Sequence, residues 1–157
     1  MLIGWIITAV VLGMLAYPIL QIIPSAAQKR QMLLRQAAQQ KGLRIQTRPP
    51  KLPDALASQY PQLMTCVGYC LPLTQATHAT TTLAIRGHDT DTWLWLHEQP
   101  SSTQMAAQLH RYQALPTFIL AVAQSPLGST IFWQERGDVT LIDGVHNQLQ
   151  QLNNLLV

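Results

Sequence analysis

Residues 2–23, LIGWIITAVVLGMLAYPILQII, organise the rest of this chain, because they are predominantly apolar and contain no charged side chain. At about 1.5 Å of rise per residue, a helix of this length reaches roughly 33 Å, enough to cross a hydrocarbon core of about 30 Å. In lipid, only a helix satisfies all of its backbone hydrogen bonds within a single segment. The sequence therefore predicts a transmembrane anchor over residues 1–24.

Basic residues follow this apolar segment, and none precedes it. Seven of the ten basic residues lie before the first acidic residue, Asp54, and we call them the basic collar: Lys29, Arg30, Arg35, Lys41, Arg44, Arg48 and Lys51. Lys and Arg within about 15–20 residues of a transmembrane end favour the cytoplasmic side. We therefore expect a single-pass membrane protein, with its N-terminus outside and its C-terminal domain in the cytoplasm. A cleaved signal peptide is the alternative, but it would carry a positive n-region and a shorter apolar stretch.

Residues 25–42 are predicted to form a basic juxtamembrane helix, because 26–40 consist of strong helix formers and Gly42 supplies a C-cap. Its basic residues would lie within about one Debye length of an anionic membrane surface. We predict that four of them contact the headgroups: Lys29, Arg30, Arg35 and Lys41. A solvated linker helix is the alternative interpretation.

Residues 43–157 are predicted to form a small cytoplasmic α+β domain. Strands are expected at 43–48, 65–71, 80–86, 92–97, 118–123 and 130–134, and helices at 55–60, at 101–113 and after 137. The strands at 80–97 and 118–134 form two hairpins, each across a turn rich in Gly, Pro, Ser or Asp. This order predicts helices packed on a mainly antiparallel sheet.

Cys66 and Cys70 are the only cysteines. On a strand they would share one face about 13 Å apart, too far for a disulfide. Their spacing matches neither a redox motif nor a paired zinc knuckle, so in a reducing cytoplasm we expect buried, small apolar residues. The alternative is a membrane-tethered redox or metal-binding enzyme that uses both thiols.

Trp93, Trp95 and His97 would share one face of a strand, where aromatic side chains can stack bases or contact a protein partner. Outside residues 1–53 the chain carries three basic and seven acidic residues, which disfavours nucleic acid. We therefore consider a possible partner face, with packing under a helix as the preferred alternative. The sequence contains no phosphate-binding loop, dinucleotide fingerprint, serine-nucleophile elbow or regular metal-ligand spacing. It predicts no enzyme, cofactor or metal site.

Two short motifs flank the predicted juxtamembrane helix, PSAAQKR at residues 24–30 and KGLRI at residues 41–45. This opening resembles that of the YajC-type accessory subunits of the preprotein translocase, which also run from one anchor into a basic cytoplasmic helix. The whole pattern, including IFWQERGD at residues 131–138 before a last helix, resembles an uncharacterised family of proteobacterial single-pass inner-membrane proteins. The resemblance implies the bacterial inner membrane, with the N-terminus in the periplasm. The anchor, the basic collar and the missing catalytic motifs together predict a non-enzymatic interaction or accessory subunit of an inner-membrane complex, whose partners are the lipid bilayer and another membrane protein or complex.

Overall fold

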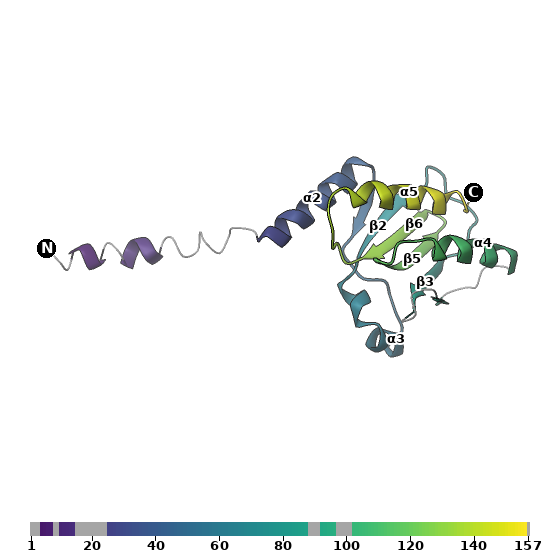
Figure 1. Ribbon diagram of the computed structural model, residues 1–157, viewed down its shortest axis with the longest axis horizontal. Coiled ribbons are helices and arrows are strands. Elements are labelled where there is room, and N and C mark those ends of the chain that lie inside the picture. The colour runs from purple at the N-terminus through teal and green to yellow at the C-terminus, as the bar shows by residue number, and fades with distance from the viewer. Residues whose placement is uncertain (1–3, 8–9, 15–24, 88–91, 97–101, 157) are drawn as a thin grey trace. The chain divides into compact units, whose positions relative to one another are not determined.

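The computed structural model describes residues 4–7, 10–14, 25–87, 92–96 and 102–156, and the chain divides into two compact units, Met1–Met32 and Leu33–Val157 (Figure 1). In the first unit, residues 4–7 and 10–14 are helical and exposed. Most of the predicted anchor, residues 1–3, 8–9 and 15–24, lies outside the described residues. Within the described part, no helix is long and apolar enough to cross a membrane.

Helix α2 (Ala26–Gln40) confirms that this segment is helical, while its place beside a membrane stays a prediction. Both ends of the helix are set by local sequence. At its start, the Ser25 hydroxyl accepts a hydrogen bond from the backbone N–H of Gln28, and the Gln28 side-chain oxygen accepts one from the backbone N–H of Ser25. This reciprocal pair is a capping box. At its end, Gly42 adopts a φ of 77°. The amides of Gly42 and Leu43 donate back to the last turn, as in a Schellman motif.

The second unit is an α+β domain with a six-stranded antiparallel sheet in the order β1-β2-β6-β5-β3-β4, as predicted in class. The strands are β1 (Arg44–Gln46), β2 (Val67–Pro72), β3 (Thr82–Arg86), β4 (Trp93–Trp95), β5 (Ile119–Ser125) and β6 (Gly128–Trp133). The other helices are α3 (Asp54–Gln59), η1 (Pro61–Thr65), α4 (Ser102–Gln113) and α5 (Leu141–Asn153).

Both predicted hairpins are confirmed as antiparallel pairs. Two details of the domain differ from the prediction. Strand β6 begins at Gly128, before the predicted residue 130, because this glycine closes the turn with a φ of 138°. The sequence pattern did not predict η1, because its first residue, Pro61, stops α3 but also fits the first position of a new helical turn.

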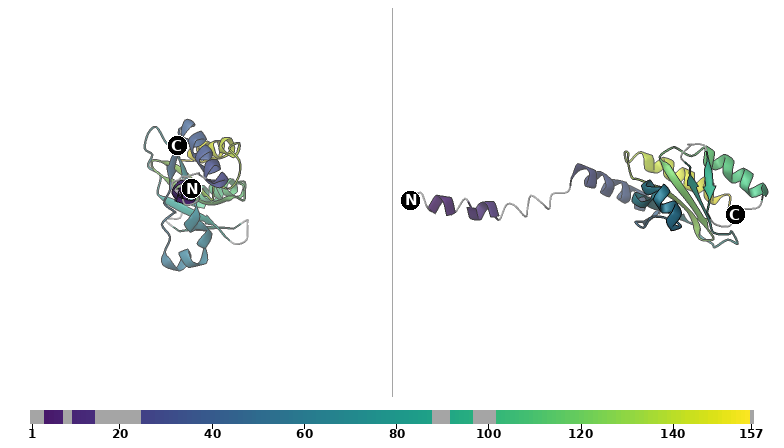
Figure 2. Two further views of the ribbon diagram at one scale, coloured as in Figure 1. Left: turned by 90° about the vertical axis from the view of Figure 1, so that its left-hand side faces the viewer. Right: turned by 90° about the horizontal axis from the view of Figure 1, so that it is seen from below.

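The sheet buries apolar side chains on both faces, because successive residues of a strand alternate between them. Ile131 and Trp133 of β6 belong to the larger core cluster, which includes residues of α2, α4 and α5. Phe132 between them belongs to a second cluster with Leu63 of η1 and Leu83 of β3. In Figure 2, α4 and α5 lie along one side of the sheet and α3 on the other.

Candidate functional site at the end of strand β6

The chain turns sharply after β6, at Glu135. Among the described residues, Glu135 is the one non-glycine residue with a positive φ, 52°. Residues other than glycine rarely adopt this backbone conformation, and a residue that does is held in it by the surrounding structure. The turn sends the Glu135 side chain into the protein, where the residue is only 2% exposed.

Glu135 joins two segments that are distant in sequence. Its Oε1 accepts from Arg35 Nε at 2.8 Å and its Oε2 from an Arg35 terminal nitrogen at 2.7 Å. Its Oε1 also accepts from the Tyr69 hydroxyl at 2.8 Å. The paired bonds from a guanidinium to a carboxylate are among the stronger polar contacts in proteins. This Arg35–Glu135–Tyr69 triad fixes the C-terminal half of α2 to β2 and to the end of β6.

Protonation within the triad follows from burial and from these contacts. The hydrogen bond to Glu135 raises the pKa of Arg35, so the guanidinium stays charged. Burial first, and then the hydrogen bond to Glu135, raise the pKa of Tyr69 well above its usual value. Tyr69 therefore remains a neutral donor. The triad contains one cation, one anion and one hydroxyl that satisfy one another.

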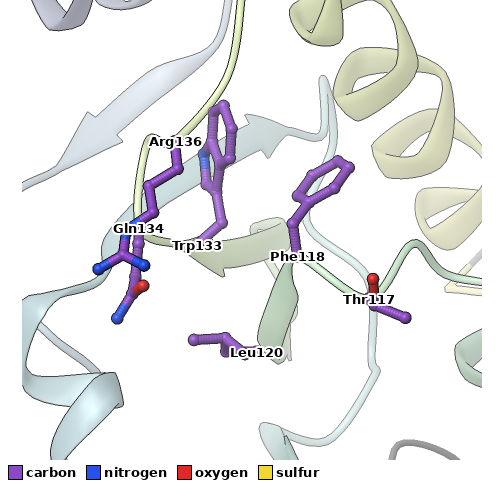
Figure 3. A pocket seen from close by; sticks show the side chains of 6 residues that line it. All are labelled: Thr117, Phe118, Leu120, Trp133, Gln134 and Arg136. Carbon is purple, nitrogen blue, oxygen red and sulfur yellow. The ribbon is translucent and has the colours of Figure 1, made fainter.

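The residues on either side of Glu135 line a cavity of about 270 Å³. Figure 3 shows Gln134 and Arg136 together on one side of it, opposite Thr117, with the rings of Trp133 and Phe118 extending in the same direction. The two ring centroids are 5.4 Å apart. The Gln134 side-chain amide donates to Gln62 and Thr65 of η1. Arg136 is the charged residue of the described lining. The described lining contains no carboxylate, imidazole or thiol.

The four predicted membrane contacts have different environments. Arg35 pairs with Glu135, and Lys41 Nζ lies 2.5 Å from a carboxylate oxygen of Asp143. Lys29 and Arg30 are exposed and form no ion pair with another described residue. Any headgroup contact by Arg35 or Lys41 must therefore compete with an existing ion pair. The sequence does not reveal the acidic partners Glu135 and Asp143, because each lies about a hundred residues further along the chain.

Trp93 and Trp95 of the predicted partner face pack against α4. The Tyr112 ring lies 5.1 Å from Trp93 and 5.2 Å from Trp95, and the Arg86 guanidinium lies 4.8 Å from the Trp93 ring centre. Trp93 is buried and Trp95 half-buried, which agrees with the alternative of packing under a helix. His97 lies outside the described residues.

Cys66 and Cys70 are both free thiols. Cys66 is buried, and its thiol donates to the carbonyl of Gln62 at 3.3 Å. Burial raises the pKa of the Cys66 thiol from its ordinary 9.0 to about 11, so the thiolate that metals and electrophiles require is scarce near neutral pH. Cys70 is half-buried on β2. Among the described residues, no three His, Cys, Asp or Glu side chains lie together in a way that could hold a metal ion.

Comparison of the chain with protein-family models, with curated proteins and with solved structures finds no match. The resemblance to YajC-type accessory subunits and to proteobacterial inner-membrane proteins therefore stays a prediction from the sequence.

Proposed function

We propose that this protein is a single-pass protein of the bacterial inner membrane that presents its α+β domain to the cytoplasm as a non-enzymatic interaction or accessory subunit. The anchor and its orientation are supported by the charge-free segment at residues 2–23 and by the basic collar that follows it. The remaining question is what the domain does there.

The Arg35–Glu135–Tyr69 triad carries the non-enzymatic part of this proposal. The side chains of catalytic acids and bases usually face a cleft and keep at least one hydrogen-bonding position free for the substrate. Here the buried carboxylate accepts three hydrogen bonds from within the chain, and its neighbours hold α2 on the sheet. Such a group serves to hold a helix in position, which suits a domain that must present a fixed surface to a partner.

Topology is tested with reporter fusions after Val157. A fluorescent protein that matures only in the cytoplasm should be active in this position, and alkaline phosphatase, which needs the periplasm, should be inactive. Strong phosphatase activity would overturn the predicted orientation. Recovery of the fusion from the soluble fraction, rather than from carbonate-washed membranes, would overturn the anchor itself.

The accessory role is tested by purification from membranes in a mild detergent. We expect the tagged protein to bring down a stoichiometric membrane partner, and a variant with Glu135→Gln to retain less of it, because the position of α2 is then less fixed. Repeated recovery of the protein alone would count against the role. Elemental analysis and thiol titration address the alternative enzyme: bound metal, or a reactive Cys66 at neutral pH, would favour it.

A further inference from the structure

Within the second unit, three residues of the basic collar have no carboxylate partner among the described residues. Arg44 of β1, and Arg48 and Lys51 in the segment that follows it, are exposed, and none forms an ion pair with another described residue. Arg35 of α2, and Lys41 directly after this helix, each pair by contrast with a carboxylate of the domain. Residues 44–51 therefore carry three exposed positive charges that no carboxylate of the described domain compensates.

An apolar cavity of about 280 Å³ lies beside two of these cations. Its floor includes Leu83, Ala123 and Phe132, which belong to the face of the sheet opposite α4 and α5. Arg48 and Lys51 are part of its rim. The volume is just below the roughly 300 Å³ at which pockets for whole small molecules begin, so the cavity suits one part of a larger ligand.

Pro49 and Pro50 form the wall between the two cations. Their rings fix the backbone, so the wall exists before a ligand arrives. Proline has no backbone N–H, and this wall therefore offers no donor row to an extended peptide that would bind by adding a strand. The site favours a ligand that brings an anionic group for the rim and an apolar chain for the floor.

We propose that this site binds the headgroup region of an anionic phospholipid. The phosphate lies between Arg48 and Lys51, and the first part of an acyl chain lies against Leu83, Ala123 and Phe132. The inference rests on the proposed membrane anchoring, because a tethered domain meets lipid at high effective concentration and a weak site then suffices. Charge complementarity and the apolar floor are both required, since free phosphate would use only the rim.

The test uses the full chain in a nonionic detergent, with bound lipid counted by native mass spectrometry. Phosphatidylglycerol should occupy one site at a concentration at least fivefold lower than phosphatidylcholine with the same acyl chains. Arg48→Gln with Lys51→Gln should remove this preference. The matched control, Arg44→Gln with Arg111→Gln, also removes two exposed positive charges of the domain and should keep the preference, because neither residue lines this cavity. Equal loss in the two double variants would show a general charge effect and overturn the site.

The floor is tested separately with Ala123→Leu, which adds a side chain that fills the cavity. It should weaken phosphatidylglycerol binding severalfold while thermal unfolding, followed by tryptophan fluorescence, stays cooperative in every variant. Undiminished lipid binding in this variant, together with full competition by glycerol phosphate, would assign the rim to a soluble phosphate compound and overturn the proposal. A partner protein lost from the Arg48/Lys51 variant with lipid binding intact would assign the surface to that protein instead.

The two proposals fail in different ways. If the protein is recovered from the soluble fraction, the membrane anchoring fails, whatever the lipid result. If it stays in carbonate-washed membranes but shows no preference for phosphatidylglycerol, only the lipid site fails.

Discussion

Replacing Glu135 by Gln tests whether the buried triad holds α2 on the domain. The substitution keeps the shape of the side chain and an oxygen that can accept from Tyr69, but it removes the negative charge opposite Arg35. Removing one partner of a buried ion pair costs about 3–5 kcal/mol. The Glu135 side chain is 1% exposed, but that of Arg35 is 36% exposed, so water can solvate the guanidinium that loses its partner. We therefore place the loss below that range, at about 2 kcal/mol.

The Lys41–Asp143 pair provides a matched control, because it also joins the C-terminal part of α2 to the domain. Its side chains are 40% and 67% exposed, and exposed pairs contribute about 0–1 kcal/mol. Asp143→Asn should therefore change the free energy of unfolding by less than about 1 kcal/mol. The contrast between the two variants depends on burial and not on the number of ion pairs.

The measurement is urea unfolding of the full chain in nonionic detergent, followed by tryptophan fluorescence. Trp133 reports on the relevant region, since its ring centroid is 5.5 Å from that of Tyr69. At an unchanged slope, the Glu135→Gln midpoint should fall clearly and the Asp143→Asn midpoint very little. Equal midpoint shifts would refute the reasoning, because the buried pair would then contribute no more than an exposed one.

Three further predictions concern other parts of the domain. Gly128→Ala should lower stability by about 1–3 kcal/mol, because φ is 138° there and a Cβ would overlap a carbonyl of β2, whereas Gly144→Ala, inside α5 with open space around it, should raise stability by about 0.5–1 kcal/mol. Gln124→Leu should cost about 1–3 kcal/mol in thermal or urea unfolding, because this fully buried amide accepts from two side chains of α4 and donates to a carbonyl of α5, and those donors would lose their acceptor. The folded protein retains the Cys66 proton between pH 9.0 and about 11 while the unfolded chain loses it, so unfolding free energy should fall as pH rises through this window, and less so in Cys66→Ala; at pH 8, a thiol reagent should modify Cys70 before Cys66.

Local sequence patterns predicted most elements of the domain, because each element is set by its own residues. Alternation and turn residues predicted the β3–β4 and β5–β6 hairpins, and both are antiparallel pairs. The pairing of β2 with β6 could not be predicted, since it depends on packing between distant residues. Gly68 of β2 lies opposite Phe132, and a Cβ on Gly68 would lie 2.8 Å from that ring.

The candidate site was harder to predict than the fold. Residues 134–137 read Gln-Glu-Arg-Gly, a sequence typical of an exposed polar loop. Nothing local shows that Glu135 enters the core, because its partner Arg35 is 100 residues earlier. Trp93 and Trp95 both lie near Tyr112 on one face of β4, and the role of this face as a partner surface stays a prediction. The helix that covers it lies beyond the strand, and alternation within a strand does not show which neighbour packs on it.

The internal ion pairs separate two effects of the basic collar that the sequence alone treats as one. In the proposed topology, orientation is decided during insertion, before the domain has folded. The basic residues within about 15–20 residues of the anchor, which include Arg35, then contribute to it whether or not they later form an ion pair. In the folded protein, Arg35 is paired with Glu135, and the charge available to an anionic surface lies elsewhere, including Arg48 and Lys51. Arg35→Gln should therefore weaken the orientation bias in a sensitised reporter fusion more than Lys51→Gln, because Lys51 lies beyond that range, but only Lys51→Gln should weaken lipid binding. If Arg35→Gln reduced phosphatidylglycerol binding as strongly as Lys51→Gln while the domain stayed folded, the ion pair with Glu135 would not neutralise Arg35 at the membrane, and the division of the collar into paired and free residues would be wrong.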